Sequence, residues 1–332
     1  MTIRLISVSR RTDIPAFYGR WFMSRVRAGF CAVPNPFNSK QISRVEINPT
    51  ETLIVFWTRW AAPFLGATDE LQRLGYRFYF QYTLVNNPTE IDPKSPSLDK
   101  AITVFRRLAD RIGPDRVVWR YDPILLSDRT NQDFHLENFT RIAKGLEGAA
   151  QRVVVSIVDP YDKAARRLIR LGEERPEFRY RTYEPERDEA MLRQLAQVAR
   201  DHGLKIQSCA EEIDLAAAGI EPGKCIDDRL IRQLFEIDVS HKKDKGQRSA
   251  CGCIESRDIG MYDSCLFGCT YCYATRSFDM ARTHHAAHDP SSESLIGDFK
   301  APPPTSKSSA PAVSTIPVQR DLRVPEIMTP DR

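Results

Sequence analysis

The sequence predicts an α/β protein with three parts: a TIM-barrel-like β/α barrel over residues 1–240, a cysteine-rich module over 241–288 and a disordered tail over 289–332. Three observations lead to this prediction. Apolar, β-rich runs alternate with segments of helical periodicity up to about residue 235, which is typical of a parallel sheet covered by helices. Five of the eight cysteines fall between positions 251 and 272. The remainder is rich in Pro and Ser without periodicity, so it cannot bury enough apolar area to fold.

The predicted strands are mostly continuous apolar runs, as expected where both faces of a sheet are buried. The clear ones are residues 5–9, 52–58, 77–84, 117–122, 152–159 and 205–210, and weaker ones lie near 31–33 and 42–47. Apolar residues three and four apart predict helices between them. One stripe is Leu98, Ile102, Phe105 and Ile112, and another is Met191, Leu195 and Val198. Seven or eight such units favour a barrel, with an open doubly wound sheet as the alternative.

Composition restricts the classes of function. Lys and Arg total 48 against 44 for Asp and Glu, and this net charge of +4 is too small to argue for nucleic-acid binding by itself. No run of about 18 apolar residues is present, so we expect no membrane-spanning helix. The first residues lack the apolar core and small-residue cleavage site of a secretory signal, so we expect a cytoplasmic protein.

The cysteine-rich module predicts a metal site. In the reducing cytoplasm, clustered cysteines hold metal more often than they form disulfides. Cys265, Cys269 and Cys272 follow the pattern C-x3-C-x2-C, and Gly268 allows the backbone to turn beside the middle cysteine. Thiolates so closely spaced fit three corners of a [4Fe–4S] cluster. One iron then keeps an open position, as a catalytic zinc does.

Two alternatives to an open cluster remain. Cys251 and Cys253 form a C-x-C pair, and eleven residues separate Cys253 from Cys265. If either supplies a fourth thiolate, the cluster is closed and serves electron transfer or structure. Zinc also takes four thiolates, but of the five cysteines only Cys269 and Cys272 have the C-x2-C spacing of a zinc knuckle.

The remaining cysteines, Cys31, Cys209 and Cys225, are predicted to be buried core thiols, since free cysteine is among the most buried residue types. Cys209 ends a predicted strand and is therefore the one among them with a candidate role in a site.

The string CLFGCTYC at residues 265–272 resembles the cluster-binding signature of radical S-adenosylmethionine (SAM) enzymes. The resemblance implies that the three cysteines hold [4Fe–4S], that SAM binds the fourth iron, and that Tyr271 lies near the adenine. It also implies reductive cleavage of SAM to a 5′-deoxyadenosyl radical, with electrons from a protein such as ferredoxin or flavodoxin. The sequence departs from those enzymes in two respects: the cysteine loop follows the predicted barrel, and we find no Gly-Gly-Glu segment.

Five further segments carry a broader resemblance: SRRTDIP at 9–15, NPFN at 35–38, FWT at 56–58, WRYDP at 119–123 and CGC at 251–253. They resemble a bacterial family named for a domain of unknown function, number eighteen forty-eight, which has a C-terminal cysteine cluster like that of radical SAM proteins. The resemblance covers nearly everything before the tail and implies no established activity.

Charged residues gather at the carboxyl ends of the predicted strands, where the active sites of β/α barrels lie. Arginines bind carboxylates or phosphates in a bidentate manner, which favours an anionic substrate. The predicted substrate-binding residues are Arg10, Arg11 and Arg59, and the predicted catalytic residues are Arg120, Asp122, Asp159 and Glu211. Arg120 and Asp122 point to the same face of one strand, so a purely structural ion pair is the alternative.

These observations support three hypotheses of function. The first is a radical-SAM-like enzyme that acts on an anionic substrate at the barrel mouth. The second is an iron–sulfur protein with a closed cluster, for electron transfer or structure. The third is a nucleic-acid-associated protein, in which Trp57, Trp60, Tyr79 and Tyr82 would stack on bases, although core packing explains such aromatics equally well.

Overall fold

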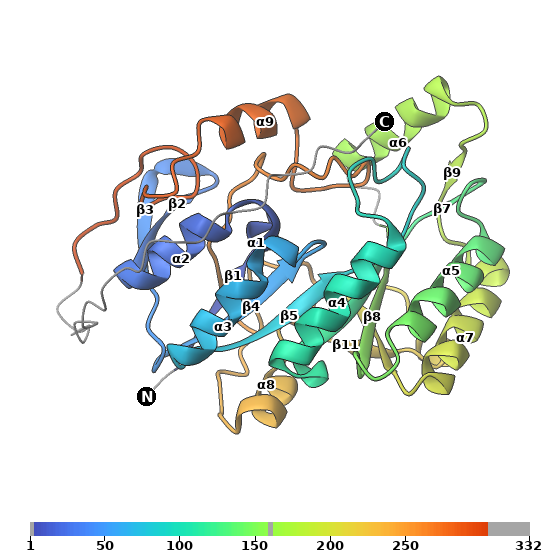
Figure 1. Ribbon diagram of the computed structural model, residues 1–332. Coiled ribbons are helices and arrows are strands. Elements are labelled where there is room, and N and C mark those ends of the chain that lie inside the picture. Colours follow the sequence, from blue (N-terminus) through green and yellow to red (C-terminus); the bar gives the residue numbers. More distant parts are fainter. Residues whose placement is uncertain (1–2, 159–161, 305–332) are drawn as a thin grey trace.

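The computed structural model describes residues 3–158 and 162–304 and is built around one parallel sheet of eight strands (Figure 1). The strand order is β11-β10-β8-β6-β5-β4-β1-β12, and every pairing in the sheet is parallel. This confirms the α/β class. Within the described part of the chain β11 and β12 are the edges of the sheet, so the predicted closed barrel is replaced by an open sheet.

The strands of this sheet are β1 (Arg4–Val8), β4 (Thr52–Thr58), β5 (Arg77–Thr83), β6 (Val117–Ile124), β8 (Arg152–Ile157), β10 (Lys205–Cys209), β11 (Glu221–Gly223) and β12 (Arg257–Asp258). The helices are α1 (Ile14–Phe17), α2 (Gly19–Ala28), α3 (Leu65–Arg73), α4 (Leu98–Ile112), α5 (Gln132–Gly145), α6 (Asp162–Glu174), α7 (Pro185–Asp201), α8 (Asp228–Phe235) and α9 (Phe278–Ala286). Short 3₁₀ turns cover Ala62–Phe64, Pro114–Arg116 and Ala216–Ala218.

Side chains alternate between two cores because successive residues of a strand point to opposite faces. In β4, Ile54 and Phe56 belong to the larger core, which includes residues of α2, α4, α5 and α7. Leu53 and Val55 point the other way, into a core that is completed by α8 and residues 251–254. Both faces of the sheet are therefore buried, as the apolar runs predict.

The predicted helical stripes are found on α4 and α7. Leu98, Phe105 and Ile112 of α4 are buried in the larger core, and α4 ends at Gly113, whose positive φ of 98° suits glycine. Met191 and Leu195 of α7 are fully buried in the same core.

The two weaker predicted strands do not join the main sheet. β2 (Phe30–Asn35) and β3 (Asn38–Glu46) pair with each other in an antiparallel hairpin. Only Pro36 and Phe37 separate them, and so short a connection allows a hairpin but not the crossover that parallel strands need. A second small antiparallel pair joins β7 (Leu126–Ser127) and β9 (Tyr180–Arg181).

The C-terminal residues return to the first strand. β12 pairs with β1, and Cys251, Cys253 and Ile254 share a core with Leu53 and Val55. Residues 241–288, predicted as a module, thus share their sheet and core with residues 1–240. In Figure 1 α9 lies at one end of the sheet and α8 at the opposite end.

The predicted tail begins too early. Residues 289–304 are described, and Leu295 and Ile296 are buried in the larger core. Polar contacts hold this segment as well: the indole Nε1 of Trp21 donates to the carbonyl of Ser292 at 3.0 Å, and the Ala32 amide donates to the carbonyl of Glu293 at 2.9 Å. The rest of the predicted tail, 305–332, lies outside the described residues.

None of the helices in the described ranges combines the length and the apolar character that crossing a membrane requires.

Candidate functional site

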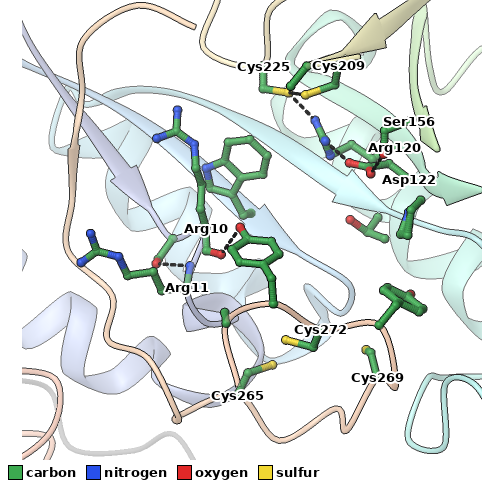
Figure 2. A pocket seen from close by; sticks show the side chains of 18 of the residues that line it. Arg10, Arg11, Arg120, Asp122, Ser156, Cys209, Cys225, Cys265, Cys269 and Cys272 are labelled. Atoms are coloured by element: carbon green, nitrogen blue, oxygen red, sulfur yellow. Dashed lines mark hydrogen bonds and ion pairs between the residues drawn. The ribbon is translucent and has the colours of Figure 1, made fainter. Parts of the chain in front are cut away.

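A cavity of about 510 Å³ lies between the carboxyl ends of the strands and the loop of residues 265–274 (Figure 2). Most of the predicted site residues line it: Arg10, Arg11, Arg59, Arg120, Asp122, Cys251, Cys253, Cys265, Cys269, Tyr271 and Cys272. Cys209 and Cys225 line it too. The structure therefore brings together residues that lie more than 250 positions apart in the sequence.

Two predicted catalytic residues stand apart from this set. Asp159 lies outside the described residues. Glu211 is not among the lining residues of the cavity; its Oε1 accepts a hydrogen bond from the Ile157 amide at 2.9 Å, and burial raises its pKa to about 7. Glu211 therefore ties the end of β10 to the end of β8.

The cysteine loop is held in place through its backbone. The Cys272 amide donates to the Cys269 carbonyl at 3.1 Å, which makes a tight turn, and Gly268 has a φ of 75° beside it. Arg167 of α6 donates to the carbonyls of Thr270, at 2.8 Å, and of Cys272. Cys265, Cys269 and Cys272 all stay free of disulfides, and Figure 2 shows the three on one side of the cavity. Burial raises the pKa of the Cys265 thiol to about 12.

A buried network joins the loop to the sheet. The Arg59 guanidinium pairs with Asp92 through contacts of 2.7 and 3.0 Å and donates to Cys269 Sγ at 2.9 Å. The Tyr271 hydroxyl accepts from Arg59 at 2.7 Å and donates to Asp92 at 3.0 Å. Burial opposes ionisation of Asp92, but Arg59 outweighs it and lowers the pKa of the carboxyl. The donors of Arg59 are thus largely used within the protein, and this residue positions the loop.

Arg120 and Asp122 form an ion pair on β6, in agreement with their predicted common face. The Arg120 side chain lies over the Trp57 ring at 4.9 Å and donates to Cys225 Sγ at 2.7 Å. Asp122 accepts a hydrogen bond from Ser156. Both members of the pair still line the cavity, so the structural alternative and a role in the site are both compatible with this geometry.

The loop that carries Arg10 and Arg11 is fixed by Asp258 of β12. The Asp258 carboxylate accepts from the hydroxyls of Ser7 and Ser9, both at 2.7 Å, and from the Arg10 amide at 2.8 Å. Arg10 lies over the Trp57 ring at 5.4 Å, on the same indole as Arg120. Its Nη1 lies 3.6 Å from Asp244 Oδ2, and its Nη2 is buried without a hydrogen bond.

Arg11 makes weaker contacts. Its guanidinium lies 5.0 Å from the Tyr262 ring and reaches the Gly260 carbonyl at 3.4 Å.

Four cysteines form a second group on the opposite side of the cavity. Cys209 Sγ and Cys225 Sγ are 2.8 Å apart, and Cys253 has hydrogen-bond contacts with both Cys225 and Cys251. Figure 2 shows Cys209 and Cys225 well separated from the cysteine loop. The contacts of Cys251 and Cys253 are therefore with Cys225 and with each other, and not with the thiols of the loop. Cys31 and Cys225 are buried in cores, as predicted, and Cys209 is partly buried; Cys209 and Cys225 also line the cavity.

Over residues 3–158 and 162–304 no group of three or more His, Cys, Asp or Glu side chains is arranged to hold a metal ion as it stands. The chemistry of the loop nevertheless fits a thiolate-bound cluster. It offers three free thiols within eight residues of one loop, each lining the cavity, and Arg59 donates to one of the sulfurs.

The aromatic residues considered for base stacking are not available as a group. Tyr79 and Tyr82 are fully buried, and each belongs to a core of the sheet. Trp57 lines the cavity between Arg10 and Arg120. The structure therefore gives no stacking surface made of these four rings.

Sequence reasoning missed several residues of the site, among them Asp92, Ser156, Cys225 and Asp258. Asp92 lies in a loop after the carboxyl end of β5, and its position after a predicted strand could have marked it as a site residue. Cys225 follows β11, a strand of three residues without an apolar pattern, so no signal marked it.

No curated protein matches this chain. The family model described as "Domain of unknown function (DUF1848)" matches residues 5–274, which include both cysteine groups and the charged strand ends. The match covers most of the chain and ends directly after the cysteine loop. The chain therefore belongs to the DUF1848 family.

Proposed function

We propose that this protein is an iron–sulfur enzyme of the radical SAM type, with a [4Fe–4S] cluster on Cys265, Cys269 and Cys272 and an anionic substrate in the cavity. One observation carries the proposal: three free thiols of a single loop line the same cavity as Arg10, Arg120 and Asp122. The spacing of the three cysteines indicates a cluster. The cavity that they share with the charged residues would allow a substrate to bind next to that cluster.

The loop has a positive charge beside one of its thiols, although burial raises the pKa of the Cys265 and Cys269 thiols. Arg59 donates to Cys269 Sγ and is itself held by Asp92, so a positive charge is fixed beside the sulfur. A nearby cation favours the thiolate, which is the form that binds metal. Tyr271 contributes its hydroxyl to the same network, and its ring packs against the small core around Leu168 while the residue lines the cavity.

The contacts of the other cysteines bear on whether one iron of the cluster keeps an open position. Cys251 and Cys253, the candidate fourth ligands, contact Cys225 and each other. This arrangement favours an open cluster on the loop over a closed one. When bound and reduced, by ferredoxin or flavodoxin, such a cluster supplies the electron for cleavage of SAM.

The opposite wall of the cavity suits an anion. Arg10 Nη2 is buried without a hydrogen-bond partner, and a carboxylate or phosphate oxygen of the substrate would satisfy it. Trp57 holds the two guanidinium groups of Arg10 and Arg120 over one ring, which limits their motion. Asp122, hydrogen-bonded to Ser156, presents a carboxylate next to this anion site.

The test uses the full chain, purified without oxygen and reconstituted with iron and sulfide. We expect the C265A/C269A/C272A variant to lose the loop's iron, and the wild-type protein, given SAM and dithionite, to form 5′-deoxyadenosine. Cys31→Ala is the control, because Cys31 is also a free cysteine but lies in β2 outside the cavity. A wild-type protein that binds iron on the loop but never cleaves SAM would refute the enzymatic part. Unchanged iron in the triple variant would refute the cluster assignment.

A further inference from the structure

The four cysteines opposite the loop come from three separate segments of the chain. Cys209 ends β10, Cys225 follows β11, and Cys251 and Cys253 precede β12. Their thiols form a continuous series of contacts, from Cys209 to Cys225, then to Cys253 and Cys251. Cys225, Cys251 and Cys253 also belong to one buried core, with Cys209 packed against it.

The contacts among these sulfurs are neither those of a disulfide nor those of a metal site. The 2.8 Å between Cys209 Sγ and Cys225 Sγ exceeds the roughly 2.05 Å of a disulfide bond. Thiolates that share a tetrahedral zinc lie farther apart, about 3.8 Å for Zn–S bonds of about 2.3 Å. The sulfurs of Cys209 and Cys225 are therefore in direct contact and must move apart to admit a metal, and all four cysteines line the cavity.

Positive charge and an amide donor already surround the group. Arg120 donates to Cys225 Sγ at 2.7 Å, and the positive charge of Arg10 acts on Cys225 and Cys253. The Ile226 amide donates to Cys253 Sγ at 3.4 Å. Four thiolates around a [4Fe–4S] core carry a net charge of roughly −2, and the two guanidinium groups lie beside it although each is also paired with a carboxylate, Arg120 with Asp122 and Arg10 with Asp244. Without a cation at the centre, four crowded thiolates would repel one another.

We propose that Cys209, Cys225, Cys251 and Cys253 bind a second [4Fe–4S] cluster, closed by four thiolates and separate from the open cluster of the loop. All four candidate ligands are thiols, which suit zinc as well as an iron–sulfur core, and the metal and sulfide analysis below distinguishes the two. With every corner ligated, this cluster offers no position to SAM or substrate. The inference stands on its own residues and does not depend on the function proposed for the loop.

The test measures iron and acid-labile sulfide per chain after anaerobic reconstitution. We expect the C265A/C269A/C272A variant to keep half of the wild-type iron and the C209A/C225A variant to keep the other half. Cys31→Ala should keep all of it, because Cys31 lies in β2 and does not line the cavity. The two partial variants should also differ in the EPR spectrum of the reduced protein, and combining them should remove the iron altogether.

The loop variant keeps the inference falsifiable even if the C209A/C225A variant fails to fold, because it leaves the four cysteines intact. If the loop variant binds no iron, the second cluster does not exist, whatever the loop does. If it binds zinc in place of iron and sulfide, or if peptide mapping finds a Cys209–Cys225 disulfide in the reconstituted protein, the proposal is also wrong. If the loop binds no cluster, the wild-type protein and the C265A/C269A/C272A variant will contain equal amounts of iron. That result would refute the function proposed for the loop but leave the second cluster standing.

Discussion

At the scale of single residues, the cavity depends on a close contact between β1 and the chain after β12. Gly260 lies directly against Ser9, and its amide donates to Asp258 Oδ1 at 2.9 Å. The same carboxylate holds the Arg10 amide. The position of Arg10 in the cavity thus depends on a residue without a side chain, 250 positions later in the sequence.

Gly260→Ala is therefore expected to destabilise the protein and to displace Arg10. An added Cβ would lie 2.0 Å from Ser9 Oγ and 2.6 Å from Ser9 Cβ, so the backbone must move. We expect a loss of about 1–3 kcal/mol in the free energy of unfolding, measured by urea denaturation. Gly66→Ala in α3 is the matched control, because nothing lies within 4 Å of its added Cβ. Equal stability of the two variants would contradict the described contact.

Individual site residues were predictable where a strand marked them. Arg10, Arg59, Arg120 and Asp122 were identified because strand ends meet at one edge of a parallel sheet, and all four line the cavity. The partners of those residues were not predictable. That Asp92 pairs with Arg59, or that Cys225 accepts from Arg120, depends on contacts across 33 and 105 positions, which no local pattern encodes.

At the scale of elements, α5 carries a buried histidine that makes stability depend on pH. His135 Nε2 contacts the Leu125 carbonyl at 3.0 Å and Nδ1 contacts the Tyr121 hydroxyl at 2.8 Å. Because a carbonyl only accepts, Nε2 carries the proton and Nδ1 accepts from Tyr121. Burial lowers the pKa of His135 to about 4, since the charged form has no room for water.

The free energy of unfolding depends on pH because His135 binds a proton more tightly in the unfolded chain than in the folded protein. Between pH 6.5 and about 4 the unfolded chain holds a proton on His135 that the folded protein lacks, so stability falls as the pH falls through this range. We expect His135 to account for up to about 3 kcal/mol of that loss. His135→Gln should flatten the curve of unfolding free energy against pH between 6.5 and 4 relative to the wild-type protein. Parallel curves for the two proteins would contradict a neutral, buried imidazole.

The elements of the main sheet were largely predictable, because six of its strands are apolar runs long enough to be recognised. Its edges were not. β11 has three residues and β12 has two, and each is defined by its pairing with a neighbour rather than by its own sequence. Without the pairing pattern of the edges, a sequence cannot distinguish an open sheet from a closed barrel.

At the scale of the whole molecule, the last described residues cover the first helices. The Tyr18 hydroxyl donates to the Ser264 carbonyl at 2.7 Å, just before the cysteine loop, and Trp21 Nε1 donates to the Ser292 carbonyl. The chain from 264 to 296 is thus attached at both ends to the stretch around α2. The Pro/Ser-rich composition that begins at residue 289 hides this role, because only Leu295 and Ile296 in residues 289–304 are buried apolar anchors of the larger core.

Leu295→Ala is expected to release this attachment. Leu295 is only 1% exposed, and removing a buried leucine side chain costs about 2–5 kcal/mol through lost burial and the cavity it leaves. The measurement is the urea midpoint together with amide exchange of the Trp21 and Ala32 regions, which should lose protection. Phe37→Ala is the control, because Phe37 is 94% exposed at the tip of the β2–β3 hairpin and should change stability by less than about 0.5 kcal/mol. If Leu295→Ala changes the free energy of unfolding as little as Phe37→Ala does, residues 289–304 are held by their polar contacts alone, and the side chain of Leu295 does not contribute to the larger core.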